Sequence, residues 1–185
     1  MSVKDLFERL RTALDAAEVP YMVVGSFASS VHGLPRATRD VDIVIAPTRE
    51  QLLRLIGQLP DTSYYADREQ ALDALKYRSQ FNIVDFVSGW KVDFIIPRLT
   101  EFTESQFDRR RVIEISGVPV YVASPEDVVI AKLAWSKEGG SGRQLEDVAS
   151  IITAQADHLD RRYIERWVRE LKLDPEWRSA LALCG

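Results

Sequence analysis

The sequence contains little cysteine and no long apolar run. Cys184 is the one cysteine among 185 residues, so the chain cannot form an internal disulfide, and a disulfide-stapled fold is excluded. A bilayer-spanning helix needs roughly 20 consecutive apolar residues, and no stretch approaches that length. The chain opens on a charged amphipathic pattern instead of an apolar leader. We therefore expect an unprocessed cytoplasmic protein without membrane association.

The chain also lacks an excess of positive charge. The formal net charge is −4, from 24 basic and 28 acidic residues. This balance excludes a protein that coats nucleic acid through a broad basic surface, although it allows a local basic cleft. The glycine-rich segment at 139–142 is not a phosphate loop, because no Lys-Ser or Lys-Thr pair follows it. With 46% hydrophobic residues, the chain can bury one good core and a small annex.

The apolar pattern indicates an α+β head followed by a helical tail. Short apolar or alternating runs predict strands at 21–24, 40–45, 80–86, 90–96, 110–115 and 118–122. Helical spacing predicts helices at 3–17, 26–32, 48–58, 67–77, 125–137, 143–155, 160–172 and 175–183. We therefore divide the chain into an α+β core at 1–123 and a C-terminal helical subdomain at 124–185 that packs on the core.

Two carboxylates share one face of the strand predicted at 40–45. Residues two apart in a strand lie about 6.5–7 Å apart on the same face, so Asp40 and Asp42 point together. Val41 and Ile43 then face the core. Like charges placed this way repel, and a divalent cation that prefers oxygen ligands, Mg²⁺ or Mn²⁺, neutralises them. The alternative is a solvated edge strand with two surface aspartates, because Asp-x-Asp triplets are frequent.

The pair Gly25-Ser26 stands where the strand at 21–24 gives way to the helix at 26–32. Unpaired backbone N–H groups and the positive end of a helix dipole favour an anion such as a phosphate at this position. Taken singly, Gly25 fits an ordinary turn and Ser26 a helix cap. The order of this pair and its spacing from Asp40 favour a phosphate site.

Three tail residues and one arginine of the head are candidates for nucleotide contact. Lys132 is the one charge in the otherwise apolar stretch 128–135, where it must reach solvent, pair with a carboxylate or bind a phosphate. Arg143 and Asp147 stand four apart on the next helix, a spacing that also suits a surface ion pair. Arg39 precedes the acidic pair, where it could contact a phosphate or balance the aspartates.

Other conspicuous side chains are predicted to be structural. We expect Trp135, Trp167 and Trp177 to pack between helices instead of stacking on bases, because apolar residues accompany them in the predicted helices. His32 is interpreted as a structural histidine at the end of a short helix.

Three segments together resemble the signature of the nucleotidyltransferase superfamily typified by DNA polymerase beta: Val23-Val24-Gly25-Ser26, Asp40-Val41-Asp42 and Lys91-Val92-Asp93-Phe94. Further residues resemble the abortive-infection (AbiEii-like) toxin branch, which contains the nucleotidyltransferase toxins of bacterial toxin–antitoxin systems: Ala28, His32, Gly33, Arg36, Thr38 and Arg39. The resemblance implies that the head is a mixed β-sheet flanked by helices.

The resemblance also implies a two-metal phosphoryl-transfer site. Asp40 and Asp42 would bind a nucleotide-associated and a catalytic Mg²⁺ or Mn²⁺, and Asp93 would complete the catalytic site. Asp85, on the partner strand, is the rival for this third position. The nucleotide would be bound by Gly25, Ser26, Arg39, Lys132, Arg143 and Asp147.

The leading hypothesis is an enzyme that transfers a nucleoside monophosphate from a nucleoside triphosphate to a hydroxyl on tRNA, another RNA or a partner protein, with release of pyrophosphate. Such an enzyme could be the toxin of a toxin–antitoxin pair. Two alternatives remain open. One is a nucleotide-binding or antitoxin-like interaction module without turnover, and the other is an antibiotic adenylyltransferase. The oligomeric state also remains open.

Overall fold

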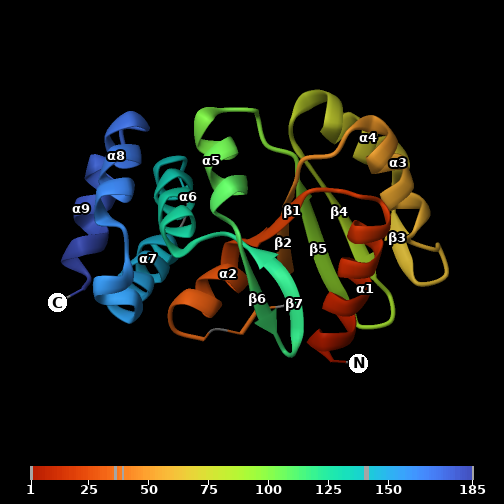
Figure 1. Ribbon diagram of the computed structural model, residues 1–185, viewed down its shortest axis with the longest axis horizontal. Helices are drawn as coiled ribbons and strands as arrows, with labels where there is room; N and C mark the ends of the chain where they lie inside the picture. The colour runs from red at the N-terminus through yellow and green to blue at the C-terminus, as the bar shows by residue number, and fades with distance from the viewer. Residues whose placement is uncertain (1, 36, 39, 140–141, 185) are drawn as a thin grey trace. The chain divides into compact units, whose positions relative to one another are not determined.

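The computed structural model describes residues 2–35, 37–38, 40–139 and 142–184 (Figure 1). Contacts divide the chain into two compact units, one of residues 1–24 and 38–122 and the other of residues 25–37 and 123–185. The sequence led us to expect a division at 123 and 124; in the structure residues 25–37 group with the helices that follow residue 123. Within the described residues, no helix is both long enough and apolar enough to cross a bilayer.

The described part of the first unit contains a mixed seven-stranded sheet. Its strand order is β3-β4-β5-β2-β1-β7-β6, with β1 parallel to β7, β2 parallel to β5 and the other neighbours antiparallel. The mixed sheet expected for the head is thereby confirmed. The strands are β1 (Tyr21–Val24), β2 (Asp40–Ile45), β3 (Tyr64–Ala66), β4 (Gln80–Asp85), β5 (Trp90–Ile95), β6 (Arg111–Ile115) and β7 (Val118–Val122).

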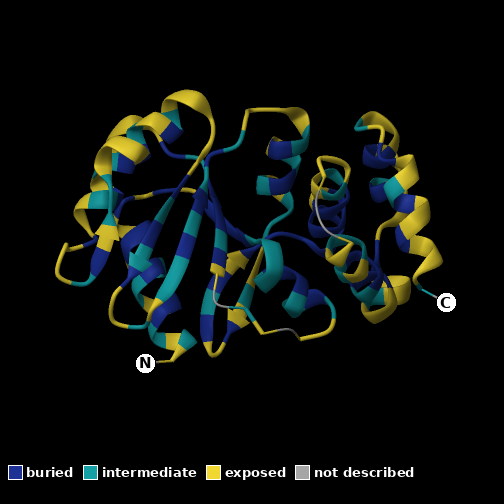
Figure 2. Ribbon diagram, turned by 180° about the vertical axis from the view of Figure 1, so that it is seen from behind, coloured by how far each residue is buried: buried dark blue, intermediate teal, exposed yellow. Residues whose placement is uncertain are grey.

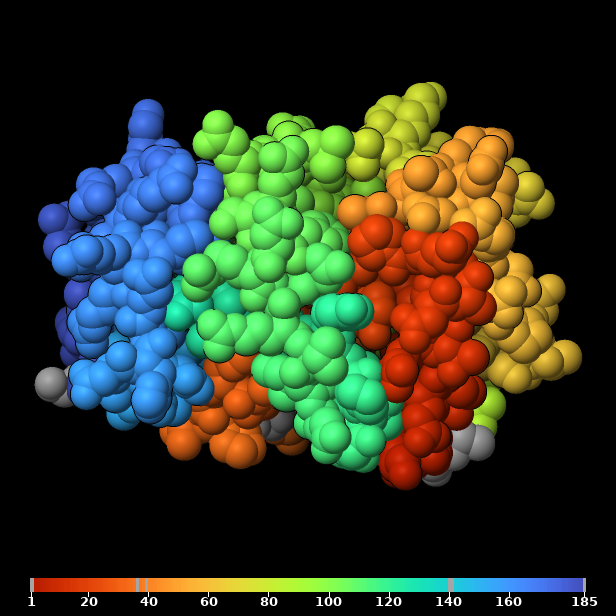
Figure 3. Space-filling view, viewed as in Figure 1, coloured from red at the N-terminus to blue at the C-terminus, as the bar shows by residue number. Residues whose placement is uncertain are grey.

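The helices of this unit begin at capping residues that the sequence supplies. Ser2 caps α1 (Val3–Ala16) and Thr48 caps α3 (Arg49–Gly57), each in a reciprocal capping box. Asp67 caps α4 (Arg68–Tyr77), and Thr100 caps α5 (Glu101–Arg109). In Figure 3, α1 runs in red beside the strands β6 and β7, and α1 contacts β7.

Side chains alternate between the two faces of the sheet, and on β4 and β5 this alternation separates an apolar face from a more polar one, called the polar face below. On β4 and β5 the buried positions include Phe81, Ile83, Val92 and Phe94, and Asn82 and Asp93 between them are only partly buried. Figure 2 shows alternating buried and intermediate positions along the strands. Arg9 of α1 pairs with a carboxylate on the face of Phe81 and Ile83, so α1 covers the apolar face. The polar face is therefore the one that presents Asp42 and Asp93.

The second unit is helical in its described part. It comprises α2 (Gly25–His32), α6 (Pro125–Lys137), α7 (Arg143–Gln155), the 3-10 turn η1 (Ala156–His158), α8 (Arg161–Glu170) and α9 (Asp174–Ala182). Helix α6 contacts α2, α7, α8 and α9, so it is the central helix of the unit. Its buried side chains include Val129, Ile130 and Leu133, which are fully inaccessible to solvent.

Buried carboxylates fix the start of α6. Ser124 caps the helix, and its hydroxyl donates to Asp127 at 2.6 Å. Asp127 also accepts a 2.7 Å hydrogen bond from the Tyr163 hydroxyl of α8, while Glu126 accepts from the backbone N–H of Asp160 at 3.0 Å. Paired in this way, the two acids tie α6 to α8 and need no ligand to explain their burial.

Most of the predicted elements are confirmed, and α6 and α7 have the predicted bounds. Strand β3 and helix α5 were not predicted. β3 has only three residues and exists because it pairs with β4, so it has little local signal. α5 has Thr103 and Gln106 at its buried positions, so it lacks the apolar stripe that marks a packed helix.

The tryptophan prediction is correct for two of the three side chains. Trp167 and Trp177 are buried, as expected. Trp135 is 55% exposed, so the expectation that it packs between helices is wrong. It lies near the end of α6, three residues after the buried Lys132, and apolar sequence neighbours did not reveal which side of the helix it occupies.

Candidate functional site

The Gly25 turn joins the two units. Gly25 follows Val24, the last residue of β1, and begins α2 with a φ of +61°, a backbone conformation that favours glycine. Ser26 therefore lies in the first turn of α2 and is not the N-cap residue that precedes the helix. The carbonyls of Gly25 and Ser26 accept from the Ser29 and Ser30 hydroxyls at 2.8 and 3.0 Å. The first N–H groups of a helix have no partner within the helix, and such helix starts favour an anion.

Three acidic residues lie on the polar face of the sheet, on two neighbouring strands. Asp42 of β2 and Asp93 of β5 are partners in the parallel register, so their Cα atoms lie about 4.8 Å apart, the usual strand spacing. Asp40 precedes Asp42 by one pleat on the same face, and Asn82 of β4 lies opposite Asp93. Asp40 is exposed and Asp42 is partly buried. The sheet thus brings together the three carboxylates proposed as metal ligands.

Lys91 lies among these carboxylates. It is the register partner of Asp40, and its Nζ donates to Asp93 Oδ2 at 2.8 Å. The hydrogen bond to Asp93 raises the pKa of Lys91, burial opposes this, and the negative charges of Asp93, Asp40 and Asp42 raise it further. The Lys91 ammonium therefore interacts electrostatically with all three carboxylates. Lys91 was not identified as a site residue from the sequence, although its position two residues before Asp93 already placed both side chains on one strand face.

The chemistry of the acidic cluster fits a divalent cation. Carboxylate oxygens are the donors that Mg²⁺ and Mn²⁺ prefer, and the backbone register holds the three acids on neighbouring positions of one face. As the side chains are oriented, no group of three acidic, histidine or cysteine side chains in the described residues could hold a metal ion. Like charges repel when no cation lies between them, and Asp93 is paired with Lys91.

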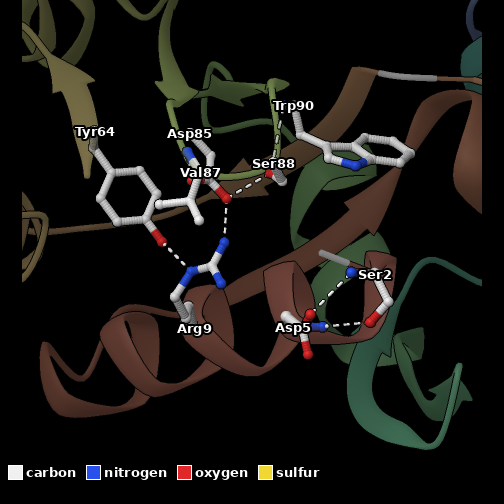
Figure 4. A network of polar contacts seen from close by, with 8 residues as sticks. All are labelled: Ser2, Asp5, Arg9, Tyr64, Asp85, Val87, Ser88 and Trp90. Carbon is white, nitrogen blue, oxygen red and sulfur yellow. Dashed lines mark hydrogen bonds and ion pairs between the residues drawn. The ribbon is translucent and has the colours of Figure 1, made fainter.

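Asp85, the rival for the third carboxylate, projects from the other face of the sheet. It shares the apolar face with Ile83 and is fully buried. It forms an ion pair with Arg9, accepts from the Ser88 hydroxyl at 2.6 Å and accepts from the Val87 backbone N–H at 3.0 Å (Figure 4). Tyr64 accepts from Arg9 Nε at 2.9 Å. Asp85 is thus part of a structural network and cannot join Asp40 and Asp42.

Lys132 is paired inside the second unit. Its side chain is 6% exposed, and its Nζ donates to Asp147 Oδ2 at 2.7 Å and to Gln144 Oε1 at 2.9 Å, both on α7. An ammonium has three N–H donors, so one donor is left for a further oxygen. Of the three outcomes that the sequence allowed, pairing with a carboxylate is the one observed. Gln144 was not identified from the sequence.

The remaining candidates are not part of a described cluster. Arg143 is exposed and is the first residue of α7. Arg39 and Arg36 lie outside the described residues. His32 is buried and its Nε2 hydrogen-bonds the Ala123 carbonyl at 2.8 Å, in agreement with a structural histidine.

This order of parts defines a class of enzyme. A strand ends in a glycine turn that opens a helix, the next strand carries two acids on one face, and a parallel neighbour of that strand carries a third. A mixed sheet with this arrangement is the head of a nucleotidyltransferase. The chain belongs to the family described as nucleotidyltransferase of unknown function (DUF6036), which matches residues 1–178. No curated protein matches the sequence.

Solved structures share this fold at low sequence identity. ANT(2″)-Ia, solved with adenylyl-2″-tobramycin, has a TM-score of 0.62 and 13% identity over 91% of this chain and 95% of its own. The lincosamide antibiotic adenylyltransferase LnuA, solved with lincomycin, has a TM-score of 0.54 and 15% identity over 82% and 96% of the two chains. An antigenic nucleotidyltransferase-like protein from Paracoccidioides brasiliensis has a TM-score of 0.50 and 19% identity over 98% and 94%. These similarities establish the fold.

Proposed function

We propose that this nucleotidyltransferase uses a divalent cation, Mg²⁺ or Mn²⁺, to transfer a nucleoside monophosphate from a nucleoside triphosphate to a hydroxyl on an RNA or a protein. The observation that carries the proposal is the register of Asp42 with Asp93, which aligns carboxylates of two strands on one face beside Asp40. Carboxylates gathered in this way are costly without a cation, and phosphoryl transfer depends on positioned charge.

The reaction forms one bond and breaks one. The acceptor oxygen attacks the α-phosphorus, the bond from that phosphorus to the oxygen bridging to the β-phosphate breaks, and pyrophosphate leaves. A bound divalent cation supplies positive charge for the phosphates and lowers the pKa of the attacking hydroxyl. Asp40, Asp42 and Asp93 would hold the cation, and Asp93 would also accept the hydroxyl proton.

Further residues would contact the nucleotide, as the resemblance implies. The turn at Gly25-Ser26 offers backbone N–H groups to a phosphate. Lys132 contacts the triphosphate with its remaining donor, while Asp147 holds the ammonium in place. Arg39 and Arg143 contact the phosphates or the acceptor, as the resemblance implies.

The resemblance to the abortive-infection (AbiEii-like) branch supports a further proposal, that this activity is the toxin of a toxin–antitoxin system. The acceptor is then tRNA, another RNA or a partner protein. A cytoplasmic location is part of the same proposal, since the chain has a single cysteine. Transfer to a small-molecule hydroxyl is the second candidate, favoured by the fold shared with two antibiotic adenylyltransferases.

A transfer assay tests the proposal. Purified protein is incubated with Mg²⁺ and each α-labelled nucleoside triphosphate, with total RNA, a cell protein extract, an aminoglycoside or a lincosamide as acceptor. We expect labelled RNA or protein. For Asp42→Asn we expect the transfer rate to fall by a factor of about 100 or more. Asp73→Asn, which changes an exposed carboxylate on α4, is the matched control and should match the wild type.

The outcomes separate the candidates. Label in the aminoglycoside or lincosamide alone would replace the RNA or protein acceptor with a small molecule. Calorimetric binding of nucleotide without product on any acceptor would favour the nucleotide-binding or antitoxin-like module. Equal rates for wild type and Asp42→Asn would contradict the proposed site.

A further inference from the structure

We propose that Lys91 is a counter-cation of the acidic cluster formed by Asp40, Asp42 and Asp93. Its ammonium neutralises part of the charge of the cluster, and a divalent cation must displace the ammonium in order to bind. The inference rests on the proposed function, because it concerns the same cluster. It adds a residue to the site and a competition that sets the apparent metal affinity.

The position of Lys91 is fixed by two strands. Lys91 lies opposite Asp40 in the parallel register and two residues before Asp93 on its own strand, so its side chain rises from the same face as all three acids. Its Nζ is 2.8 Å from Asp93 Oδ2, which is a charge-assisted hydrogen bond. The ammonium therefore neutralises part of the charge that a metal ion would otherwise neutralise.

The sheet register places the ammonium beside all three acids, because Lys91 is opposite Asp40 and its hydrogen-bond partner Asp93 is opposite Asp42. A divalent cation carries twice the charge and accepts several oxygen ligands, so it competes with the ammonium for Asp93.

The ion pairs Lys91–Asp93 and Arg9–Asp85 differ in how easily the cation can leave its carboxylate. Arg9 is held by both Asp85 and Tyr64, and the Asp85 side chain is 0% exposed. The Lys91 side chain is 42% exposed and the Asp93 side chain 14%. The Lys91 ammonium, on a flexible four-carbon stem, can therefore turn into solvent at little cost. Opening the Arg9 pair would instead leave the buried Asp85 carboxylate without its cation.

Metal binding measured without turnover tests the inference. Mn²⁺ affinity is determined from the electron paramagnetic resonance signal of the free ion for wild type, Lys91→Met and Lys91→Arg. Lys76→Met, which removes an exposed lysine of α4 in the same unit, is the control for loss of one charge. We expect Lys91→Met to bind Mn²⁺ about fivefold tighter, the strength of a partly exposed ion pair. Lys91→Arg and Lys76→Met should stay near the wild-type affinity.

Thermal unfolding supplies a second readout. In EDTA, Lys91→Met should melt below the wild type, because Asp93 loses its ion-pair partner beside two further carboxylates. Saturating Mn²⁺ should raise the melting temperature of Lys91→Met by more than it raises that of the wild type. If Lys91 were merely structural, Lys91→Met would lower the melting temperature by the same amount in EDTA and in Mn²⁺, and the Mn²⁺ affinity would be unchanged.

The outcomes keep the two proposals apart. Wild-type protein that binds Mn²⁺ and transfers nucleotide, together with Lys91→Met that binds Mn²⁺ no tighter, would overturn the counter-cation and leave the proposed function intact. Absence of Mn²⁺ binding in the wild type and all variants would overturn the metal-dependent function itself. Tighter binding in Lys91→Met and in Lys76→Met alike would reduce the effect to net charge and overturn the specific role of Lys91.

Discussion

Asp93 and Asp85 lie on neighbouring antiparallel strands but project from opposite faces of the same sheet. Asp93 is opposite Asn82, and Asp85 is opposite Trp90, three residues further along the pair and therefore on the other face. One acid therefore joins Asp40 and Asp42, while the other is buried with Arg9. The two acids should respond to substitution in different ways.

Asp85→Ala should destabilise the protein without removing the metal site. The change leaves Arg9 beside a buried cavity and deprives Ser88 of its acceptor, which costs about 3 kcal/mol of unfolding free energy. Urea denaturation measures this loss, and Mn²⁺ binding is measured on the folded fraction. Asp93→Asn is the comparison and should change stability little while weakening Mn²⁺ binding at least tenfold. The reverse pattern would show that Asp85 is the third ligand.

The pair of Lys132 and Asp147 should behave as a coupled unit. Asp147→Leu leaves a nearly buried ammonium without its carboxylate and should cost about 3 kcal/mol. Lys132→Met combined with Asp147→Leu removes both charges and should recover most of that loss. A double-mutant cycle by urea denaturation gives the coupling energy. Additive effects would mean that the pair contributes no net interaction, contrary to its 2.7 Å contact.

Gly33→Ala should destabilise the second unit although Gly33 lies in no strained conformation. A Cβ at this position would lie 2.6 Å from Ser150 Oγ and 3.1 Å from the Ile151 backbone nitrogen. Ser150 Oγ already accepts from the Leu34 backbone N–H at 2.7 Å, so it cannot move freely. The expected cost is about 1–3 kcal/mol.

Gly57→Ala is the matched control for Gly33→Ala. Gly57 is the last residue of α3, and nothing lies within 4 Å of a Cβ built there. Alanine favours helix over glycine, so the melting temperature should stay level or rise slightly. Equal loss of melting temperature in both variants would contradict the steric explanation at Gly33.

Alkaline pH should weaken the first unit through Tyr21. Burial, followed by the nearby charge of Asp15, raises the pKa of the Tyr21 hydroxyl from 10.0 to about 12. The unfolded chain therefore releases this proton first as pH rises. The stability contribution is complete below pH 10 and is lost as pH passes through about 12.

Denaturation midpoints in urea across this pH range check the Tyr21 prediction. Wild-type protein should lose stability more steeply than Tyr21→Phe, which has no hydroxyl to ionise. Tyr77→Phe, at a tyrosine that is 64% exposed, should follow the wild type. Identical pH profiles for all three proteins would assign the alkaline loss to other groups.

Local pattern was sufficient for much of the fold because helices and strands have characteristic periods. The bounds of α6 and α7, the turn at Gly25 and the shared face of Asp40 and Asp42 follow from neighbours within a few residues. The same alternation assigns Lys91 to the face of Asp93, although its role was not recognised.

Tertiary structure decided everything that depends on which distant segments meet. The parallel pairing of β2 with β5 places Asp42 beside Asp93, 51 positions later, and the buried pair with Arg9 removes Asp85 from the site. Long-range pairing also created β3, and the packing around α6 leaves Trp135 exposed. A period along the chain tells which side chains share a face, but only the packed sheet and helices determine what that face meets. The sequence therefore specified which acids are present, and the sheet register specified which of them share a face.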